Sequence, residues 1–543
     1  MDEYYVFSTR SLWLELCIPN SLVKKCFIEN FGRSNKTLDK PDAKILLISI
    51  VDNLQQKFVD RFAKQSTHAS LTELYKVLDE CYHFYKRQKE ARVEMKKINV
   101  AGSDIGDAFE VNRNICRNII DATNLWLENC VLLQSDLSED AKSTSFELDK
   151  ELLVDLYIYG LTSQCLSLLA LTKQVKGSDV FSGLEVSPTK DVPIEVQKYH
   201  PVIYFNTLIT GNQNVLSDDM ALGNANKSDF GIGFNNVHGV KFLHFLAVLR
   251  SIQQVKLCEG KYALRVTTKL EFLEIVASTT KEPVDANKFF DSFVLQQSNL
   301  IGSKQKTDPI IWKMNVNKYR HELRPFVSLN NDRVYLSYCA LDQAVNAWTS
   351  FFLNGGMCYS FASDALTNAM DSTNDELSKK LVDILREELS KRYKANPFDE
   401  INVDYKRIFG AKDINYGDFD IVYYAPEVNE LFLIEAKFFS DSLTNSSIVT
   451  DYEKLFQSDG YYDRCRRRYD LVIKEPDRIK SFLGVTAQIK VHFLFVSSKP
   501  LDIELQDDDE IVTFLCADNF GKFIDGRFEH EIDGSLVRPI YTL

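Results

Sequence analysis

Residues 418–439 read DFDIVYYAPEVNELFLIEAKFF, and this stretch decides how the C-terminal part of the chain folds. Two runs rich in β-branched and aromatic residues, 418–424 and 431–439, flank the polar segment APEVNE. Such a pattern predicts two antiparallel strands joined by a short loop. The C-terminal region is therefore expected to contain a β-hairpin.

The length of the loop sets the register expected for this hairpin. If Tyr424 lies opposite Leu431, antiparallel pairing places Asp420 opposite Glu435 and Asp418 opposite Lys437. Because side chains alternate between the two faces of a strand, these four polar side chains are expected on one face. The other face is almost wholly apolar and suited to burial against helices. It comprises Phe419, Ile421, Tyr423, Phe432, Ile434, Ala436 and Phe438.

The polar face supplies the groups that phosphodiester hydrolysis requires. The carboxylates of Asp420 and Glu435, with Asp418 as a further candidate ligand, offer the hard oxygen atoms that Mg²⁺ or Mn²⁺ prefers. The ammonium group of Lys437 would stabilise negative charge on the phosphate or hold the attacking water. We therefore predict that Asp420, Glu435 and Lys437 are the catalytic residues of a metal-dependent hydrolase.

The segments around the hairpin extend this pattern. Residues 375–393 read as an amphipathic helix, 451–473 as a helix interrupted near Gly460, and 490–497 as an apolar strand. With the sequences GDFDIV and IEAK, this order of elements resembles the PD-(D/E)XK, or restriction-endonuclease-like, nuclease superfamily over roughly residues 371–498. The resemblance implies a magnesium-dependent endonuclease.

The resemblance also implies two further site residues. In that superfamily an acid on the first helix often assists the metal, which by position would be Glu376. A Gln or Lys on the following helix often reaches the site, which would be Gln457. The chain departs from the family pattern because neither Asp418 nor Asp420 follows a proline. Which aspartate is the main ligand therefore stays open, and the register favours Asp420.

An arginine-rich run lies on the helix expected after the hairpin. The net charge of −13 argues against a protein that coats nucleic acid through its overall field, but a local basic run could neutralise phosphates near the site. The alternative is an exposed helical face whose arginines pair with Asp463 and Asp470. No residue of the run predicts recognition of particular bases, so a sequence preference is not visible. The candidate nucleic-acid-binding residues are Arg464, Arg466, Arg467 and Arg468.

The whole chain of 543 residues is expected to be multidomain. Helical periodicity fills the first third, loop-forming residues follow, and mixed signals precede the nuclease-like part, including a hairpin at 326–336 and, in the loops, a short strand at 202–205. The fold class expected is a mainly α N-terminal region, a central α+β region and a C-terminal α/β restriction-endonuclease-like domain. The divisions are a helical bundle or array at 1–175, linker and surface loops at 176–228, the central region at 229–370 and the nuclease-like domain at 371–543.

Other features of the sequence bear on location and on additional sites. The 11 cysteines include no CxxC pair, and the N-terminus resembles no signal peptide, so a cytoplasmic protein with reduced thiols and no membrane segment is expected. The eight histidines occur singly, so no zinc site is predicted. Arg61 and His68 superficially resemble the R-x(4–6)-H pair of HEPN-type ribonucleases, and a chance pairing is the favoured interpretation.

These observations predict a metal-dependent nuclease, with DNA favoured over RNA, whose N-terminal region senses or binds a partner. No Walker motif is visible, so ATP-driven translocation would need a partner ATPase, and a homo-oligomer would suit duplex cutting. The architecture resembles bacterial defence nucleases, which implies an effector of a phage-defence or restriction system. The alternative is a non-catalytic interaction or scaffold protein that carries a degenerate nuclease fold.

Overall fold

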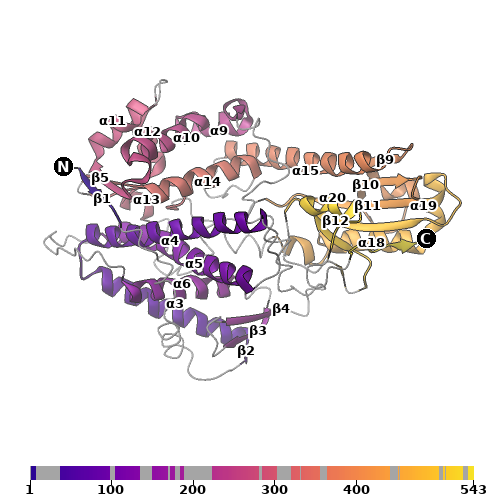
Figure 1. Cartoon of the computed structure of the whole chain (residues 1–543), viewed down its shortest axis with the longest axis horizontal. Helices are drawn as coiled ribbons and strands as arrows, with labels where there is room; N and C mark the ends of the chain where they lie inside the picture. Colours follow the sequence, from indigo (N-terminus) through magenta and orange to yellow (C-terminus); the bar gives the residue numbers. More distant parts are fainter. Residues whose placement is uncertain are drawn as a thin grey trace.

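Helices dominate the N-terminal half of the protein, and the largest sheet forms its C-terminal end, as the computed structural model shows (Figure 1). This layout confirms the expected order of a mainly α part followed by α/β parts. The structure describes residues 2–7, 37–97, 104–134, 149–168, 172–177, 184–188, 223–279, 284–301, 320–330, 332–354, 364–440, 451, 453–499, 506–507, 509–529 and 536–543.

Four long helices make up most of the N-terminal region that the structure describes. Helix α4 packs on α5, α5 on α6, and α6 on α3. Their shared core includes Trp126, whose ring contacts those of Phe58 and Tyr159. Apolar residues at helical spacing predicted these helices, because one buried stripe per helix is enough to close such a core. Their bounds are Lys40–Phe62 for α3, Thr67–Lys97 for α4, Asp104–Leu132 for α5 and Lys150–Leu168 for α6.

A small three-stranded antiparallel sheet accompanies these helices. It consists of β2 (Thr37–Asp39), β3 (Thr172–Gly177) and β4 (Leu184–Pro188). The sequence predicted the end of a helix and then a linker where β3 and β4 lie, so the structure corrects that assignment. The strand expected at 202–205 lies outside the described residues.

The central region is a five-stranded sheet covered by helices. The hairpin predicted at 326–336 is confirmed, since Phe326 pairs with Leu336. The single helix expected at 237–254 is instead broken at Gly239, whose φ of 69° caps α9 before α10 begins. The strands, in sheet order, are β1 (Glu3–Tyr5), β5 (Leu264–Thr268), β8 (Arg333–Ser337), β7 (Phe326–Ser328) and β6 (Val294–Leu295). The helices are α9 (Asp229–His238), α10 (Phe242–Ser251), α11 (Lys269–Thr279), α12 (Ala286–Phe293), α13 (Gln297–Leu300) and α14 (Tyr338–Asn354). Three short helical segments complete the region, at Ala225–Lys227, Ile252–Lys256 and Cys258–Gly260.

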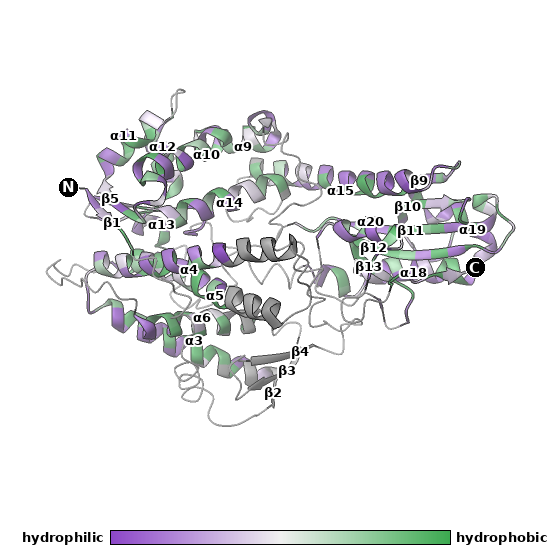
Figure 2. Ribbon diagram, in the orientation of Figure 1, coloured by the Kyte–Doolittle hydropathy of each residue, from purple (hydrophilic) through white to green (hydrophobic). Residues whose placement is uncertain are grey.

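One helix, α15 (Asp364–Arg392), connects the central region to the C-terminal sheet. Leu366 and Met370 near its start belong to the core of the central region, whereas Leu381 and Leu389 pack on the C-terminal sheet. Figure 2 shows hydrophilic and hydrophobic residues alternating along α15, as an amphipathic helix requires. The expected domain division at 370/371 therefore falls within a continuous helix.

The C-terminal sheet carries the hairpin. Strand β10 is antiparallel to both of its neighbours, β9 and β11, and β12 and β13 continue the sheet parallel to β11. Residues of α15 and α20 (Ala517–Ile524) pack on one face. Residues of α16 (Tyr405–Phe409), α18 (Tyr461–Lys474) and α19 (Pro476–Leu483) pack on the other. The strands are β9 (Phe398–Asp404), β10 (Asp418–Ala425), β11 (Glu430–Lys437), β12 (Lys490–Ser497), β13 (Thr513–Cys516) and β14 (Tyr541–Thr542), of which β14 pairs with β12.

Within the described part of the chain, no helix combines the length and the apolar character that crossing a bilayer requires.

Candidate active site

The β10–β11 hairpin has the register predicted from its loop. Tyr424 pairs with Leu431 as predicted, and the ladder ends at the pair of Ile421 with Ile434. The predicted pairs Asp420–Glu435 and Asp418–Lys437 therefore do not form part of the ladder. At the next position the carboxylate of Asp420 accepts the backbone N–H of Ala436 at 2.8 Å. A side-chain oxygen thus satisfies a backbone donor just beyond the last ladder pair, which fixes the Asp420 carboxylate beside β11.

Three predicted side chains meet at this end of the hairpin. The Lys437 Nζ atom lies 2.9 Å from Asp420 Oδ2 and 2.7 Å from Glu435 Oε1. Glu435 and Lys437 occupy alternate positions of β11 and therefore point to the same face. The structure consequently brings Asp420, Glu435 and Lys437 together around one cationic nitrogen.

Burial and charge both act on this cluster. The Glu435 side chain is 5% exposed, whereas those of Asp420 and Lys437 are 19% and 23% exposed, so solvent reaches the cluster. Burial raises the pKa of Asp420, the Glu435 charge adds to this, and the Lys437 ammonium opposes it. Burial alone would lower the pKa of Lys437, but the charges of Glu435 and Asp420 outweigh that effect and raise it. Lys437 therefore stays protonated and holds both carboxylates.

Arg468 of α18 completes the cluster, although the sequence assigned it another role. Its guanidinium group forms a buried ion pair with Glu435 and donates to the Tyr416 carbonyl at 2.8 Å. Only 4% of this side chain is exposed, so Arg468 is not placed to neutralise phosphates on the surface. Gly417 makes room for it, because a Cβ atom there would lie 2.9 Å from the guanidinium and φ is 75°.

The spacing of residues along α18 could have revealed that Arg468 is buried. It shares the buried face of α18 with Cys465, Tyr469 and Val472, at intervals of three and four residues. A buried arginine needs an anionic partner, and Glu435 supplies it. A second missed neighbour is Tyr461, whose ring lies 5.7 Å from Lys437 Nζ.

Three other predicted residues lie outside the cluster. Asp418 is exposed at the start of β10, where it pairs with Asp404 of β9. Glu376 is exposed on α15, whose leucines pack on the opposite face of the sheet. Gln457 is exposed in the turn before α18. Within the described residues, none of the three forms a hydrogen bond or ion pair with Asp420, Glu435 or Lys437.

The remaining arginines of α18 are engaged mainly with acidic groups. Arg466 pairs with Asp470, Asp507 and Asp509. Arg467 pairs with Asp459. The exposed Arg464 donates to the Asp459 carbonyl at 2.9 Å. These contacts favour the alternative in which the arginines belong to a charge-paired helical face.

The apolar face of the hairpin is as predicted except at one position. Ile421, Tyr423, Phe432, Ile434 and Ala436 lie in the core with α15, and Phe438 packs against it. Phe419 was expected on that face but belongs to the opposite core, with Tyr469 of α18. The ring lies beneath the Arg468 guanidinium, which is 5.7 Å away, so it helps to shield the Glu435–Arg468 pair from water.

The donor set of this cluster fits a divalent cation. Two carboxylate oxygens from neighbouring strands already approach the same ammonium nitrogen, which serves as a stand-in for a metal ion. Arg468 fixes the other oxygen of Glu435 and so orients the carboxylate. Asp420 and Glu435 are the residues that would hold Mg²⁺ or Mn²⁺.

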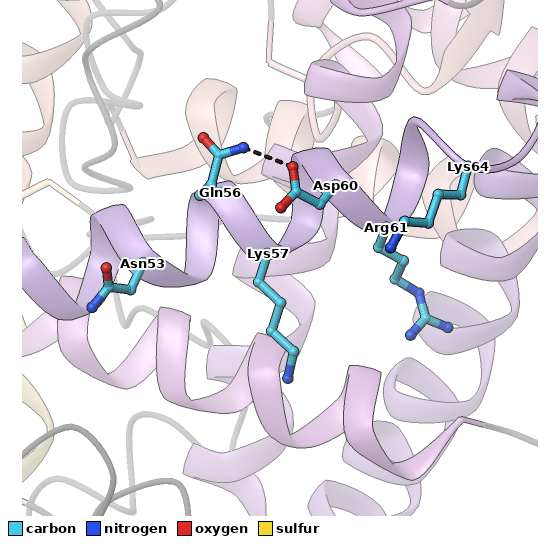
Figure 3. Close-up of a pocket in the computed structure, with 6 residues that line it drawn as sticks. All are labelled: Asn53, Gln56, Lys57, Asp60, Arg61 and Lys64. Carbon is cyan, nitrogen blue, oxygen red and sulfur yellow. Dashed lines mark hydrogen bonds between the residues drawn. The ribbon is translucent and has the colours of Figure 1, made fainter.

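A hollow on α3 is lined in part by Arg61, the arginine that the sequence analysis considered together with His68 (Figure 3). Arg61 points into the space between helices and pairs with Glu73 and Asp149. His68 is bound elsewhere, by the hydroxyl groups of Tyr5 and Tyr335. Arg61 and His68 are thus engaged with different partners, which does not support a ribonuclease pair. The hollow is lined by Asn53, Gln56, Lys57, Asp60, Arg61 and Lys64.

Comparisons of the chain with protein-family models, with curated proteins and with solved structures give no match.

Proposed function

We propose that the C-terminal domain is a Mg²⁺- or Mn²⁺-dependent nuclease of the PD-(D/E)XK type, acting on DNA in preference to RNA. One observation carries the proposal: Asp420 Oδ2 and Glu435 Oε1 lie 2.9 and 2.7 Å from the same Lys437 nitrogen, at the ends of adjacent strands. Two acids and a lysine in this arrangement are the donors that metal-dependent phosphodiester hydrolysis uses.

Each side chain has a distinct part in this proposal. Asp420 and Glu435 would bind a divalent ion, which would acidify water and neutralise charge on the scissile phosphate. Once the carboxylates are engaged in this way, Lys437 is released to donate to a phosphate oxygen or to hold the attacking water. Arg468 keeps Glu435 in place, as a positioning residue.

The surrounding sheet supports the proposal. The hairpin lies in the middle of a mixed sheet in which β12 runs parallel to β11, and helices cover both faces. Helix α15 packs both in the central region and on this sheet, so the two parts share one continuous helix. We propose on this basis that the first part of the chain binds a partner or trigger and controls the nuclease, as in a phage-defence or restriction effector.

A second candidate function has its own observation. Both oxygens of Glu435 are engaged, one by Lys437 and the other by Arg468, which makes the cluster a closed set of ion pairs. Such a set would also suit a scaffold protein that retains the fold without activity. The two candidates differ in whether a divalent metal displaces Lys437.

Nuclease assays on the full chain test the proposal. Supercoiled plasmid and single-stranded RNA are incubated with millimolar Mg²⁺ or Mn²⁺ and with wild type, Asp420→Asn, Glu435→Gln or Lys437→Met. Each substitution is expected to reduce plasmid cleavage by at least about 100-fold. The control Glu427→Gln, in the exposed β10–β11 turn, should cleave like wild type. Metal-dependent cleavage that survives all three substitutions would contradict the proposal, and faster cleavage of RNA would reverse the substrate preference.

A further inference from the structure

A second cluster of ligand-type side chains lies where α4 meets the start of α14. Asp79 and His83 are one helical turn apart on α4, and Cys339 is the second residue of α14. One ligand atom from each lies within 4.8 Å of the others. This cluster belongs to different elements from the Asp420 cluster and plays no part in the proposed hydrolysis.

We propose that Asp79, His83 and Cys339 bind one zinc-like transition-metal ion that joins the helical region to the central region. Carboxylate, imidazole and thiolate are the ligand types of tetrahedral zinc sites. Cys339 Sγ lies 3.2 Å from Asp79 Oδ1, and His83 Nε2 lies 3.4 Å from the same oxygen. Ligand atoms about 2.0–2.3 Å from a tetrahedral zinc are about 3.3–3.8 Å apart, so only small movements are needed to enclose an ion.

The surroundings of the cluster favour a cation. Asp79 is 2% exposed, and within the described residues its ion-pair partner is His83, which is charged only when protonated. The neighbouring carboxylate of Asp342, in contrast, is neutralised by Arg250 and Lys86. A buried carboxylate without a permanent counter-charge is costly, and a bound metal ion removes that cost.

The geometry also lets an ion reach the cluster from solvent and fixes the orientation of the His83 imidazole. The His83 side chain is 33% exposed, so the cluster opens to solvent there and a water molecule can be the fourth ligand. The Tyr338 ring stacks on the imidazole at 5.9 Å, which fixes its plane. Burial and the charge of Asp79 raise the pKa of the Cys339 thiol, so the bound ion would have to displace the thiol proton. The class of ligand is thus a borderline-soft divalent ion, Zn²⁺ or Co²⁺, rather than Mg²⁺.

Cobalt titration of the full chain tests this inference. The protein is stripped with a chelator and titrated with Co²⁺, and the thiolate-to-cobalt charge-transfer absorption is recorded. One equivalent with this band is expected for wild type and for two controls, Cys258→Ser, which removes an exposed thiol, and Asp420→Asn at the proposed active site. The Asp420→Asn control separates this site from the nuclease proposal, because Asp420 lies in the other cluster.

Substitutions of the ligands complete the test. Cys339→Ser should lose the band, and His83→Gln should bind Co²⁺ at least about tenfold more weakly. His83 is partly exposed, so His83→Gln decides the matter if Cys339→Ser fails to fold. The inference is overturned if wild type shows no thiolate band, if the band persists in Cys339→Ser, or if His83→Gln binds Co²⁺ as tightly as wild type.

Discussion

Two clusters of this protein contain carboxylate groups, but the chain assembles them differently. The Asp420 cluster consists of Asp420, Glu435, Lys437 and Arg468, and the Asp79 cluster of Asp79, His83 and Cys339. Asp420, Glu435 and Lys437 come from two strands joined by a short turn, so local pairing brings them together. Asp79 and Cys339 are 260 residues apart and meet only when two regions dock. Local clusters can therefore be predicted from sequence, whereas docked clusters require the tertiary structure.

The clusters also differ in how their charge is balanced. In the Asp420 cluster two carboxylates face two permanent cations, Lys437 and Arg468. In the other, Asp79 faces a histidine and a thiol. A metal ion must compete with existing ion pairs in the first cluster but supplies the missing charge in the second.

The largest expected effect on stability concerns Arg468. Arg468→Gln leaves one oxygen of Glu435, which is 5% exposed, without its buried partner, while Lys437 still holds the other oxygen. The free energy of unfolding should fall by about 3 kcal/mol, the lower end for breaking a buried ion pair. Denaturant titration measures this change. The matched control Arg464→Gln, on the exposed face of the same helix, should change it by no more than about 0.5 kcal/mol. Equal effects of the two substitutions would show that the buried pair contributes no more than a surface contact.

Removing the metal ion from the Asp79 cluster should lower the free energy of unfolding slightly less than Arg468→Gln does. An ion that binds only the folded protein stabilises it by about 2.7 kcal/mol at 100 times its dissociation constant. Zinc added to stripped wild type should therefore raise the unfolding midpoint. The same zinc concentration should stabilise His83→Gln by no more than about 1.4 kcal/mol, half as much, because its site binds at least about tenfold more weakly. A rise of the same size in both proteins would place the zinc at another site.

Lys437 should affect metal binding and cleavage in opposite directions. Lys437→Met removes the cation that now occupies both carboxylates, so Mn²⁺ should bind about tenfold more tightly, or about 1.4 kcal/mol. Cleavage should nevertheless be lost, because the ammonium group has no replacement. Isothermal titration calorimetry with Mn²⁺ gives the affinity. Weaker binding in Lys437→Met would mean that the two carboxylates do not form the metal site.

The smallest expected effect is a pH dependence. Because the pKa of Asp420 is raised above 3.8, the native state binds this proton more tightly than the unfolded state does. The stability contributed by protonated Asp420 is therefore present below pH 3.8 and is lost as the pH rises through the raised pKa. The free energy of unfolding of wild type minus that of Asp420→Asn should fall over this range. If this difference in the free energy of unfolding grew with pH instead, the ion pair with Lys437 would outweigh burial in setting the pKa of Asp420.

The sequence predicted what depends on local patterns. The helices of the N-terminal region follow from apolar periodicity, and the Tyr424–Leu431 register follows from the length of the turn. Phe419 was misplaced because strict alternation does not hold at Asp420, where the ladder ends and a side chain replaces a backbone acceptor. Strand irregularities of this kind depend on contacts that the hairpin sequence does not contain.

Other features depend on residues far apart in the chain. Strand β1 pairs with β5, although Glu3 and Val266 lie far apart in the sequence, with the helical region between them. Arg468 was assigned to a surface because its neighbours Arg466 and Arg467 are charged, and its burial results from docking of α18 on the sheet. The histidines and cysteines showed no metal-binding spacing, since Asp79, His83 and Cys339 converge only through α14.

Anomalous diffraction from a crystal soaked in Mn²⁺ tests the central claim most directly. We expect a peak about 2.2 Å from carboxylate oxygens of both Asp420 and Glu435, with Lys437 Nζ moved away from at least one of them. A crystal in which Lys437 still bridges both carboxylates at saturating Mn²⁺, with no peak between them, would contradict it.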